Sequence, residues 1–263
     1  MPSADKRARK KENARAAREE REAALRRKKR TRSTVTVAVV VVIFVGVIVL
    51  LNATGSSKKK VAVAKLPAGC VSTVPAQTKK TLYKTQPPRV ITLNLKITYT
   101  AHISTTCGPF DMALNVRDAP NASNSFVFLA EHHFYDGLKF QRVAKNFVVQ
   151  GGDPKGDGTG GPGYQLATEP PKYGYRQGTV AMANGGAGTT GSQFFIVLND
   201  AAGKLLEQQG SPFRYSALGQ VTKGFDVVQK LGTLYNPDQN PNDSTTQHTS
   251  VPLYIFKVTI TKK

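Results

Sequence analysis

The sequence predicts a mainly β protein: a closed antiparallel barrel with few helices, preceded by a basic tail and one transmembrane helix. Short runs of alternating apolar and polar residues, separated by glycine-rich turns, fill the chain from residue 89 onward, as is typical of barrels. An uncharged apolar run and a basic cluster precede them. We therefore expect four segments: a cytoplasmic tail (1–32), a transmembrane helix (33–53), an extracytoplasmic linker (54–88) and a folded domain (89–263).

The first 32 residues predict a solvated tail. They hold 14 Lys or Arg and five acidic residues, with almost no large apolar side chain that could bury a core. The whole chain has a net formal charge of +20, but its other basic residues are spread out and form no clustered face with interleaved aromatic residues. We therefore expect no nucleic-acid partner, and anionic lipid headgroups are the expected contact of the tail.

Residues 35–51 form an uncharged apolar run of 17 residues. At 1.5 Å per residue, the run and its neutral flanks reach about 30 Å, the thickness of a bilayer core. A buried core helix would show a polar face, and a signal peptide normally has a shorter basic head; cleavage after the run stays an open alternative. Because the basic cluster lies N-terminal to the run, we expect a single-pass cell-membrane protein with a cytoplasmic N-terminus and its folded domain outside the cytoplasm.

Cys70 and Cys107 are the only two cysteines of the chain, and both fall on the side that is predicted to be oxidising. A disulfide between them would tie the end of the linker to the folded domain; two free buried thiols are the alternative. Two isolated cysteines and four histidines without ligand spacing do not form a zinc site. We expect no metal.

The folded domain begins with short strands, and helical patterns occur in two of its segments. Alternating residues predict strands over 90–93, 99–104, 110–116, 138–143, 147–150 and 251–260. Helices are predicted over residues 126–130, after a cap at Asn121 or Ser123, and over residues 221–232.

Residues 178–198 combine a short apolar strand, a glycine-rich turn and a second strand that carries Gln193 and Phe195 on one face. Polar groups thus lie beside an aromatic wall. The turn matches the GxGxxG pattern over residues 186–191, as does the segment 158–163. Neither predicts a dinucleotide site, because such a site needs a helix that begins in the loop; one match contains proline and the other continues into a strand.

Three blocks carry a resemblance to a known family: residues 140–143 (Phe-Gln-Arg-Val), residues 147–153 (Phe-Val-Val-Gln-Gly-Gly-Asp) and residues 178–198. Together they resemble the cyclophilin family of peptidyl-prolyl isomerases, over about residues 99–260. The resemblance implies an eight-stranded barrel capped by two helices, and cis-trans isomerisation of X–Pro bonds (EC 5.2.1.8). Because the folded domain is expected to follow a transmembrane helix and to lie outside the cytoplasm, we expect exported or cell-envelope proteins as its substrates. The resemblance also implies proline-containing polypeptides as partners and no cofactor, and we expect a monomer.

The resemblance implies catalytic roles for Arg142 and Gln150. The matching arginine of the family points its guanidinium at the prolyl nitrogen, which favours the pyramidal nitrogen of the transition state. The rotation needs no nucleophile and no metal, because its barrier comes from amide resonance. The expected substrate-binding residues are Phe147, Val148, Phe195 and Leu218 in a proline pocket, Gln193 with Gln150 on the substrate backbone, Ala183 and Asn184 at a peptide-pairing edge, and Tyr215. For Phe147 and Phe195 a mainly structural role is the alternative.

Several positions depart from the family pattern. Gln141 stands where the family usually has histidine, Val148 where methionine is common, Leu218 where phenylalanine is usual and Tyr215 in place of a common histidine, and the chain has no tryptophan. These departures motivate an alternative hypothesis, a catalytically weak chaperone or scaffold that binds proline-containing peptides. Clear exchange between the cis and trans NMR signals of an X–Pro peptide would refute it.

Overall fold

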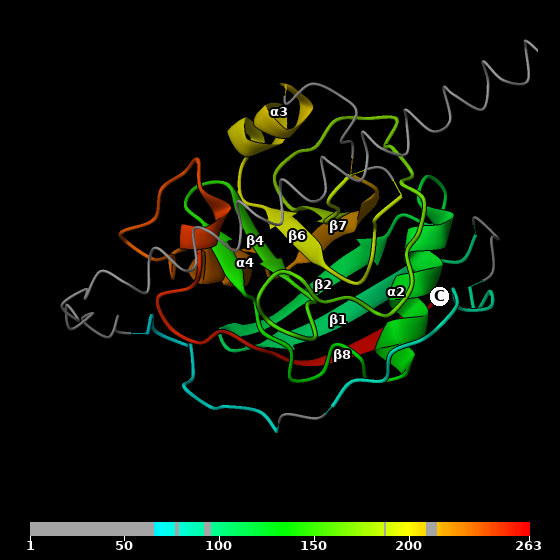
Figure 1. Ribbon diagram of the computed structural model, residues 1–263, viewed down its shortest axis with the longest axis horizontal. Coiled ribbons are helices and arrows are strands. Elements are labelled where there is room, and N and C mark those ends of the chain that lie inside the picture. The colour runs from blue at the N-terminus through cyan, green and yellow to red at the C-terminus, as the bar shows by residue number, and fades with distance from the viewer. Residues whose placement is uncertain (1–65, 77–78, 92–95, 187, 209–214) are drawn as a thin grey trace, which may run out of the picture. The chain divides into compact units, whose positions relative to one another are not determined.

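The computed structural model describes residues 66–76, 79–91, 96–186, 188–208 and 215–263, which all belong to one compact unit, residues 62–263. Its elements, shown in Figure 1, are β1 (Tyr99–Thr105), β2 (Gly108–Leu114), α2 (Pro120–Glu131), β3 (Arg142–Ala144), β4 (Val148–Gly151), β5 (Thr179–Met182), β6 (Phe194–Val197), α3 (Asp200–Gln208), β7 (Ala217–Lys223), α4 (Phe225–Gly232), the short 3₁₀ helix η1 (Ser244–Thr246) and β8 (Ile255–Lys262). Within these described ranges, no helix has the length and apolar character needed to cross a membrane. The predicted tail and transmembrane helix lie outside them.

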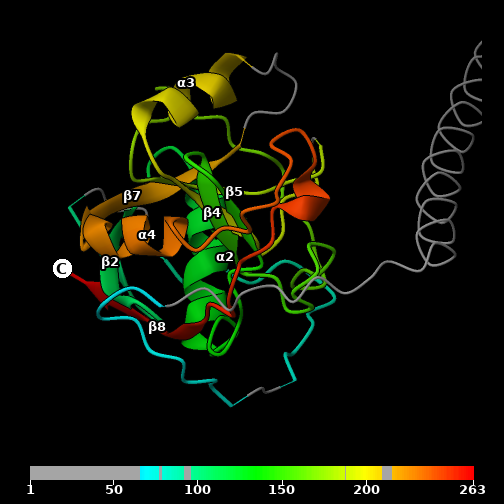
Figure 2. The same ribbon diagram turned by 90° about the vertical axis from the view of Figure 1, so that its left-hand side faces the viewer.

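The eight strands of the described chain form one antiparallel sheet in the order β3-β4-β6-β5-β7-β2-β1-β8, curled into a half-barrel (Figures 1 and 2). The expected number of strands is confirmed. Full closure of the barrel is not, because the end strands β3 and β8 do not pair with each other. Residues 137–140 bridge the gap instead: Phe140 N donates to Leu253 O over 2.9 Å, and Ile255 N donates to Leu138 O over 2.8 Å.

Alternation along the strands separates two apolar clusters, one on each face of the sheet. The main core takes Val143, Val149, Val180 and Ile196, together with the buried residues of α2 and α4. The second cluster takes Ala144, Val148, Ala181, Phe195 and Val197. It is completed by Ala202 and Leu206 of α3, a third helix where the sequence predicted two.

Helix α2 is buried over residues 122–130. It begins at Pro120, and its first N–H groups are capped from a distance: the Glu169 carboxylate accepts from Asn121 N over 3.0 Å and from Ala122 N over 2.9 Å. The predicted side-chain cap at Asn121 or Ser123 is therefore wrong. A carboxylate at this end of the helix also complements the partial positive charge of the helix dipole.

The segment that precedes β1 forms an irregular strap over the domain, which we define as residues 66–76 and 79–91. The predicted disulfide between Cys70 and Cys107 is present and ties the strap to the turn between β1 and β2. At the other end, the Asn124 side chain of α2 accepts hydrogen bonds from the backbone N–H groups of residues 90 and 91 at 2.7 and 3.2 Å. These two residues thus belong to the covering of α2 and not to the strand predicted for residues 90–93.

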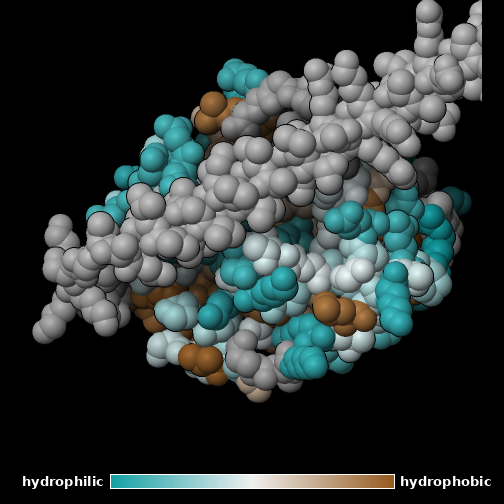
Figure 3. Space-filling view, in the orientation of Figure 1, coloured by the Kyte–Doolittle hydropathy of each residue, from teal (hydrophilic) through white to brown (hydrophobic). Residues whose placement is uncertain are grey.

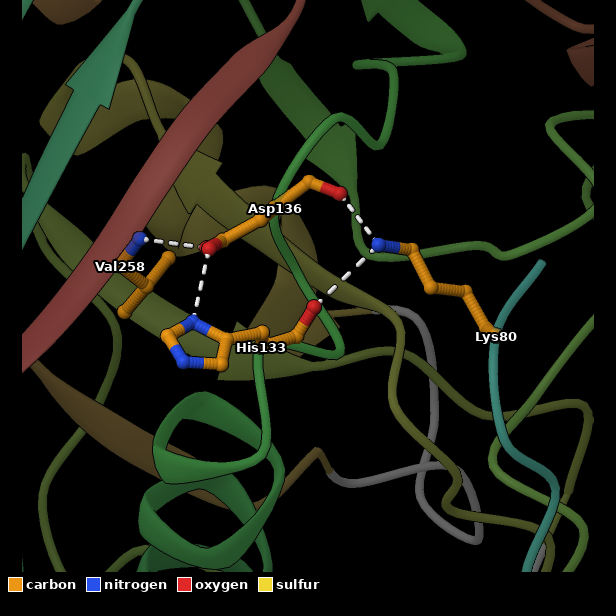
Figure 4. Close-up of polar contacts among 4 residues, drawn as sticks. All are labelled: Lys80, His133, Asp136 and Val258. Carbon is orange, nitrogen blue, oxygen red and sulfur yellow. Dashed lines mark hydrogen bonds and ion pairs between the residues drawn. The ribbon is translucent and has the colours of Figure 1, made fainter. Parts of the chain in front are cut away.

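Lys80 anchors the middle of the strap to the turn that follows α2 (Figure 4). Its Nζ donates to the backbone oxygens of His133, over 3.2 Å, and Asp136. The Asp136 carboxylate in turn accepts from His133 Nδ1 and from Val258 N of β8, each over 3.0 Å. Burial lowers the pKa of Lys80, and the charge of Asp136 opposes that shift. The part of the predicted linker that the structure describes is therefore packed onto the domain.

Candidate active site

Arg142, Gln150 and Phe195 lie side by side because their strands pair in register. Arg142 of β3 stands opposite Gln150 of β4, and Gln150 stands opposite Phe195 of β6. Ala181 of β5 continues the row. Directly opposite residues of antiparallel strands point to the same face of the sheet. The ladder therefore brings a cation, an amide and an aromatic ring to one place.

The Arg142 guanidinium is held on two sides. Its Nε donates to Gln247 Oε1 over 2.8 Å, and its Nη1 donates to Gln150 Oε1 over 3.0 Å. The third nitrogen, Nη2, has no hydrogen-bond partner among the described residues. Burial lowers the pKa of Arg142, and the neighbouring Tyr215 acts in the opposite direction. An arginine keeps its charge across the neutral pH range, so the site presents an oriented cation with donors left for a ligand.

Gln193 links Gln150 to the glycine-rich segment 158–163, one of the two that match the GxGxxG pattern. Its Oε1 accepts from Gln150 Nε2 over 3.0 Å and from Gln141 Nε2 over 2.9 Å. Its Nε2 donates to the backbone oxygens of Gly158 and Gly160, each over 2.9 Å. Because the amide is bonded at both ends, only one orientation satisfies it. Gln150, whose Nε2 is committed to Gln193, must then turn its Oε1 to Arg142.

An apolar cluster adjoins this polar network. Val148 and Phe195 belong to it, with only 1% and 4% of their surface exposed, and the half-buried Phe147 and Tyr215 pack against it. The Phe195 and Tyr215 rings meet edge to face with centroids 5.0 Å apart. Tyr175 fixes this arrangement, since its hydroxyl accepts from Tyr215 N and donates to Tyr215 O, each over 2.8 Å.

Leu218 is the one predicted pocket residue that the structure does not bring to the site. Its side chain is 0% exposed and lies in the main core. Its neighbour Ala217 stands opposite Ala181, which belongs to the pocket face. Because side chains alternate between the faces of a strand, Leu218 points the other way. Its assignment to the proline pocket is thus corrected.

A groove of about 740 Å³ lies beside the glutamine network. Its lining includes four predicted site residues, Gln150, Ala183, Asn184 and Gln193, together with all of segment 158–165 and Leu82 of the strap. Ala183 N donates to Gln193 O over 2.9 Å, which places the predicted peptide-pairing edge directly next to Gln193. Apart from Leu218, the structure thus gathers the predicted substrate-binding residues into two adjoining parts, an apolar cluster and a groove.

The family model described as cyclophilin type peptidyl-prolyl cis-trans isomerase/CLD matches residues 100–256. The chain belongs to the cyclophilin family. It is a cyclophilin-type peptidyl-prolyl cis-trans isomerase, EC 5.2.1.8.

The relatives of this cyclophilin carry the same activity in their names. It is 39% identical to a peptidyl-prolyl cis-trans isomerase of Helicobacter pylori over 137 residues, covering 50% of this chain and 78% of that one. It is 32% identical to the peptidyl-prolyl cis-trans isomerase CYP18-2 of Arabidopsis thaliana over 165 residues, covering 61% of this chain and 90% of that one. A crystal structure of a Cryptosporidium parvum cyclophilin type isomerase gives a TM-score of 0.54 at 26% identity, covering 62% and 98%. A second structure of that protein, solved with the dipeptide Ala-Pro, gives 0.53 at 27% identity and the same coverage.

Two contributors to the cyclophilin site were missed by the sequence analysis, Gln247 and Tyr175. Gln247 is only 3% exposed, and it is held by a loop made almost entirely of polar residues. Its Nε2 donates to Asn240 O over 3.2 Å and to Pro241 O over 2.9 Å, while its backbone oxygen accepts from Val143 N over 2.9 Å. The loop has no apolar periodicity that could have predicted a buried glutamine.

We expect the change Gln247→Ala to lower kcat/KM by about tenfold, because the guanidinium of Arg142 loses one of its two supports and reactive geometry is sensitive to small displacements. NMR of the Arg142 Nε–H group checks the cause: in the variant its signal should shift and exchange faster with water. Gln239→Ala is the matched control. Gln239 lies in the same loop as Gln247, but its Oε1 accepts a hydrogen bond from Lys145 N and not from Arg142. An equal loss in both variants would point to the loop as a whole and contradict a positioning role for Gln247.

Proposed function

We propose that this cyclophilin uses Arg142 to isomerise X–Pro bonds in exported or cell-envelope proteins, as a membrane-anchored enzyme outside the cytoplasm. The observation that carries the proposal is the half-buried Arg142 guanidinium, held by Gln150 and Gln247 beside the apolar cluster of Phe147, Phe195 and Tyr215. A cation in this setting can donate to a prolyl nitrogen whose ring is held by the pocket.

The chemistry requires only that amide resonance be weakened. Rotation about an X–Pro bond faces a barrier of about 18–20 kcal/mol because the C–N bond has partial double-bond character. A donor at the prolyl nitrogen stabilises its lone pair once the amide is twisted and interacts little with the planar ground state, so it acts mainly in the transition state. A 10⁵-fold acceleration requires about 7 kcal/mol in total. The hydrogen bond from Arg142 would contribute part of this amount.

The proposed extracytoplasmic location is supported by the first 51 residues of the chain and by its cysteines. Fourteen basic residues precede the apolar run in residues 1–32, and basic segments stay on the cytoplasmic side. Both cysteines are joined in a disulfide, and disulfides persist mainly in oxidising compartments. Proteins that fold in such a compartment are the proposed substrates.

NMR exchange spectroscopy on a short peptide that contains Ala-Pro tests the activity. We expect a catalytic amount of the protein to produce exchange between the cis and trans proline signals at a temperature where the free peptide shows none, since uncatalysed isomerisation takes about 10–100 s. Binding without exchange would instead support a proline-peptide-binding chaperone and overturn the proposed catalysis.

Single cysteines added on either side of the apolar run test the proposed topology. In intact cells, a membrane-impermeant maleimide should label Lys257→Cys, at an exposed position of β8, and should leave Ala8→Cys in the tail unlabelled. After lysis both should react. Labelling of both variants, or of the tail alone, in intact cells would refute the proposed orientation.

A further inference from the structure

One residue that lines the groove, Leu82, lies outside the segment that matches the cyclophilin family. Leu82 belongs to the strap and lines the groove together with Gln150, Ala183, Asn184 and Gln193, whereas the family match begins at residue 100. The strap therefore contributes to a surface that is continuous with the candidate active site.

The position of Leu82 is fixed by its neighbours along the strap. Tyr83 N donates to Pro162 O over 2.7 Å, and the Tyr83 ring packs edge to face on Phe128 of α2 with centroids 5.1 Å apart. Gly163, with φ +97°, permits this close approach, because a Cβ there would lie 2.5 Å from Tyr83 O. The anchor at Lys80 (Figure 4) holds the strap on the other side of Leu82.

Leu82 is the exposed apolar side chain of a groove that is lined largely by glycines and polar residues; of its other apolar residues, Pro162 and Tyr164 are buried and Ala183 is half-buried. Single exposed apolar residues are ordinary on protein surfaces, and Figure 3 shows several among hydrophilic neighbours. Exposure of 62% alone would therefore not mark Leu82 as a contact residue. Its place in a groove that shares four residues with the active site does.

An extended polypeptide fits this surface better than a compact ligand. The groove has a glycine-rich lining that leaves room for a peptide main chain, and its lining includes Gln150, which accepts a hydrogen bond from Arg142. A substrate whose X–Pro bond lies at Arg142 would continue into the groove over the next few residues, since an extended chain advances about 3.3 Å per residue.

We propose that Leu82 forms a subsite for an apolar side chain of the substrate outside the X–Pro pair, so that the strap takes part in substrate selection. This inference rests on the proposed function, because it assumes that proline-containing polypeptides occupy the site.

Binding of a peptide series to the full-length chain, with ¹³C-labelled leucine methyl groups, tests the subsite. The host peptide is Gly-Ser-rich with a central Ala-Pro, and leucine replaces serine at one of three positions on either side. We expect one position at which leucine lowers Kd by about fivefold, as partial burial of two leucine side chains allows. The Leu82 methyl signals should shift on binding, and the gain should vanish in Leu82→Ser.

Val74→Ser is the matched control, because Val74 lies on the same strap with 60% exposure and does not line the groove. It should keep the full gain from leucine. The proposal is overturned if no position shows a gain, if Leu82→Ser keeps it, or if the Leu82 methyl signals stay unmoved. Exchange between cis and trans signals is recorded in the same samples. Exchange without any effect of Leu82 would refute the subsite alone, and effects at Leu82 without exchange would refute catalysis alone.

Discussion

Replacement of Arg142 by alanine should lower kcat/KM for X–Pro isomerisation by about 10²- to 10³-fold, the usual effect of removing a donor that acts on charge developing in the transition state. The geometry explains why lysine should not restore the rate. Arg142 donates to Gln247 and Gln150 through two different nitrogens and keeps a third nitrogen for the substrate. The three N–H groups of a lysine share one nitrogen, which cannot occupy all three positions. We therefore expect Arg142→Lys to recover less than a tenth of the lost activity.

The measurement is NMR exchange with the Ala-Pro peptide, accompanied by the peptide's Kd. Because the donor acts mainly in the transition state, the rate should fall much more than the affinity. Arg176→Ala is the control, since Arg176 is exposed and its Nε lies 3.5 Å from Gln220 Oε1, away from the guanidinium site. Full activity in Arg142→Ala would remove the basis of the proposed mechanism.

The sequence could predict those parts of the site that lie in local motifs. Arg142, Gln150 and Gln193 each belong to a continuous block of the chain, and strand alternation decides which residues of a block share a face. The ladder from Arg142 through Gln150 to Phe195 follows from these blocks once their strands pair. For this reason the structure brings Arg142, Gln150 and Gln193 together, as the sequence predicted.

Long-range contacts were beyond such reasoning. Leu218 was assigned to the pocket by its place in a motif. A register shift between β5 and β7 falls between Ala217 and Gly219, and the side chain of Leu218 points into the core. Gln247 reaches Arg142 across 105 residues, and Leu82 reaches the groove from a segment that looks like an irregular linker. Their roles depend on tertiary packing, which leaves no periodic signal in the chain.

Removal of the disulfide should lower the free energy of unfolding by about 3–4 kcal/mol, the value that loop-closure entropy gives for a sequence separation of 37. The double variant Cys70→Ser/Cys107→Ser avoids free thiols. Unfolding of the full-length chain in guanidinium chloride can be followed by tyrosine fluorescence, since the chain has no tryptophan. The midpoint should move to a lower denaturant concentration, and the slope should rise, because the unfolded chain without the cross-link is less compact and exposes more surface.

The same loss should appear when the wild-type protein is unfolded under reducing conditions, because the disulfide acts mainly by restricting the unfolded chain. Cys107 is buried in the main core, so a serine there adds a polar group to an apolar site, and the reduced wild type separates this cost from the loss of the cross-link. Equal midpoints for the oxidised and reduced wild type would contradict the prediction. They would mean that Lys80, Tyr83 and Asn124 hold the strap without help from the disulfide. In that case Leu82 would keep its place in the groove in either redox state.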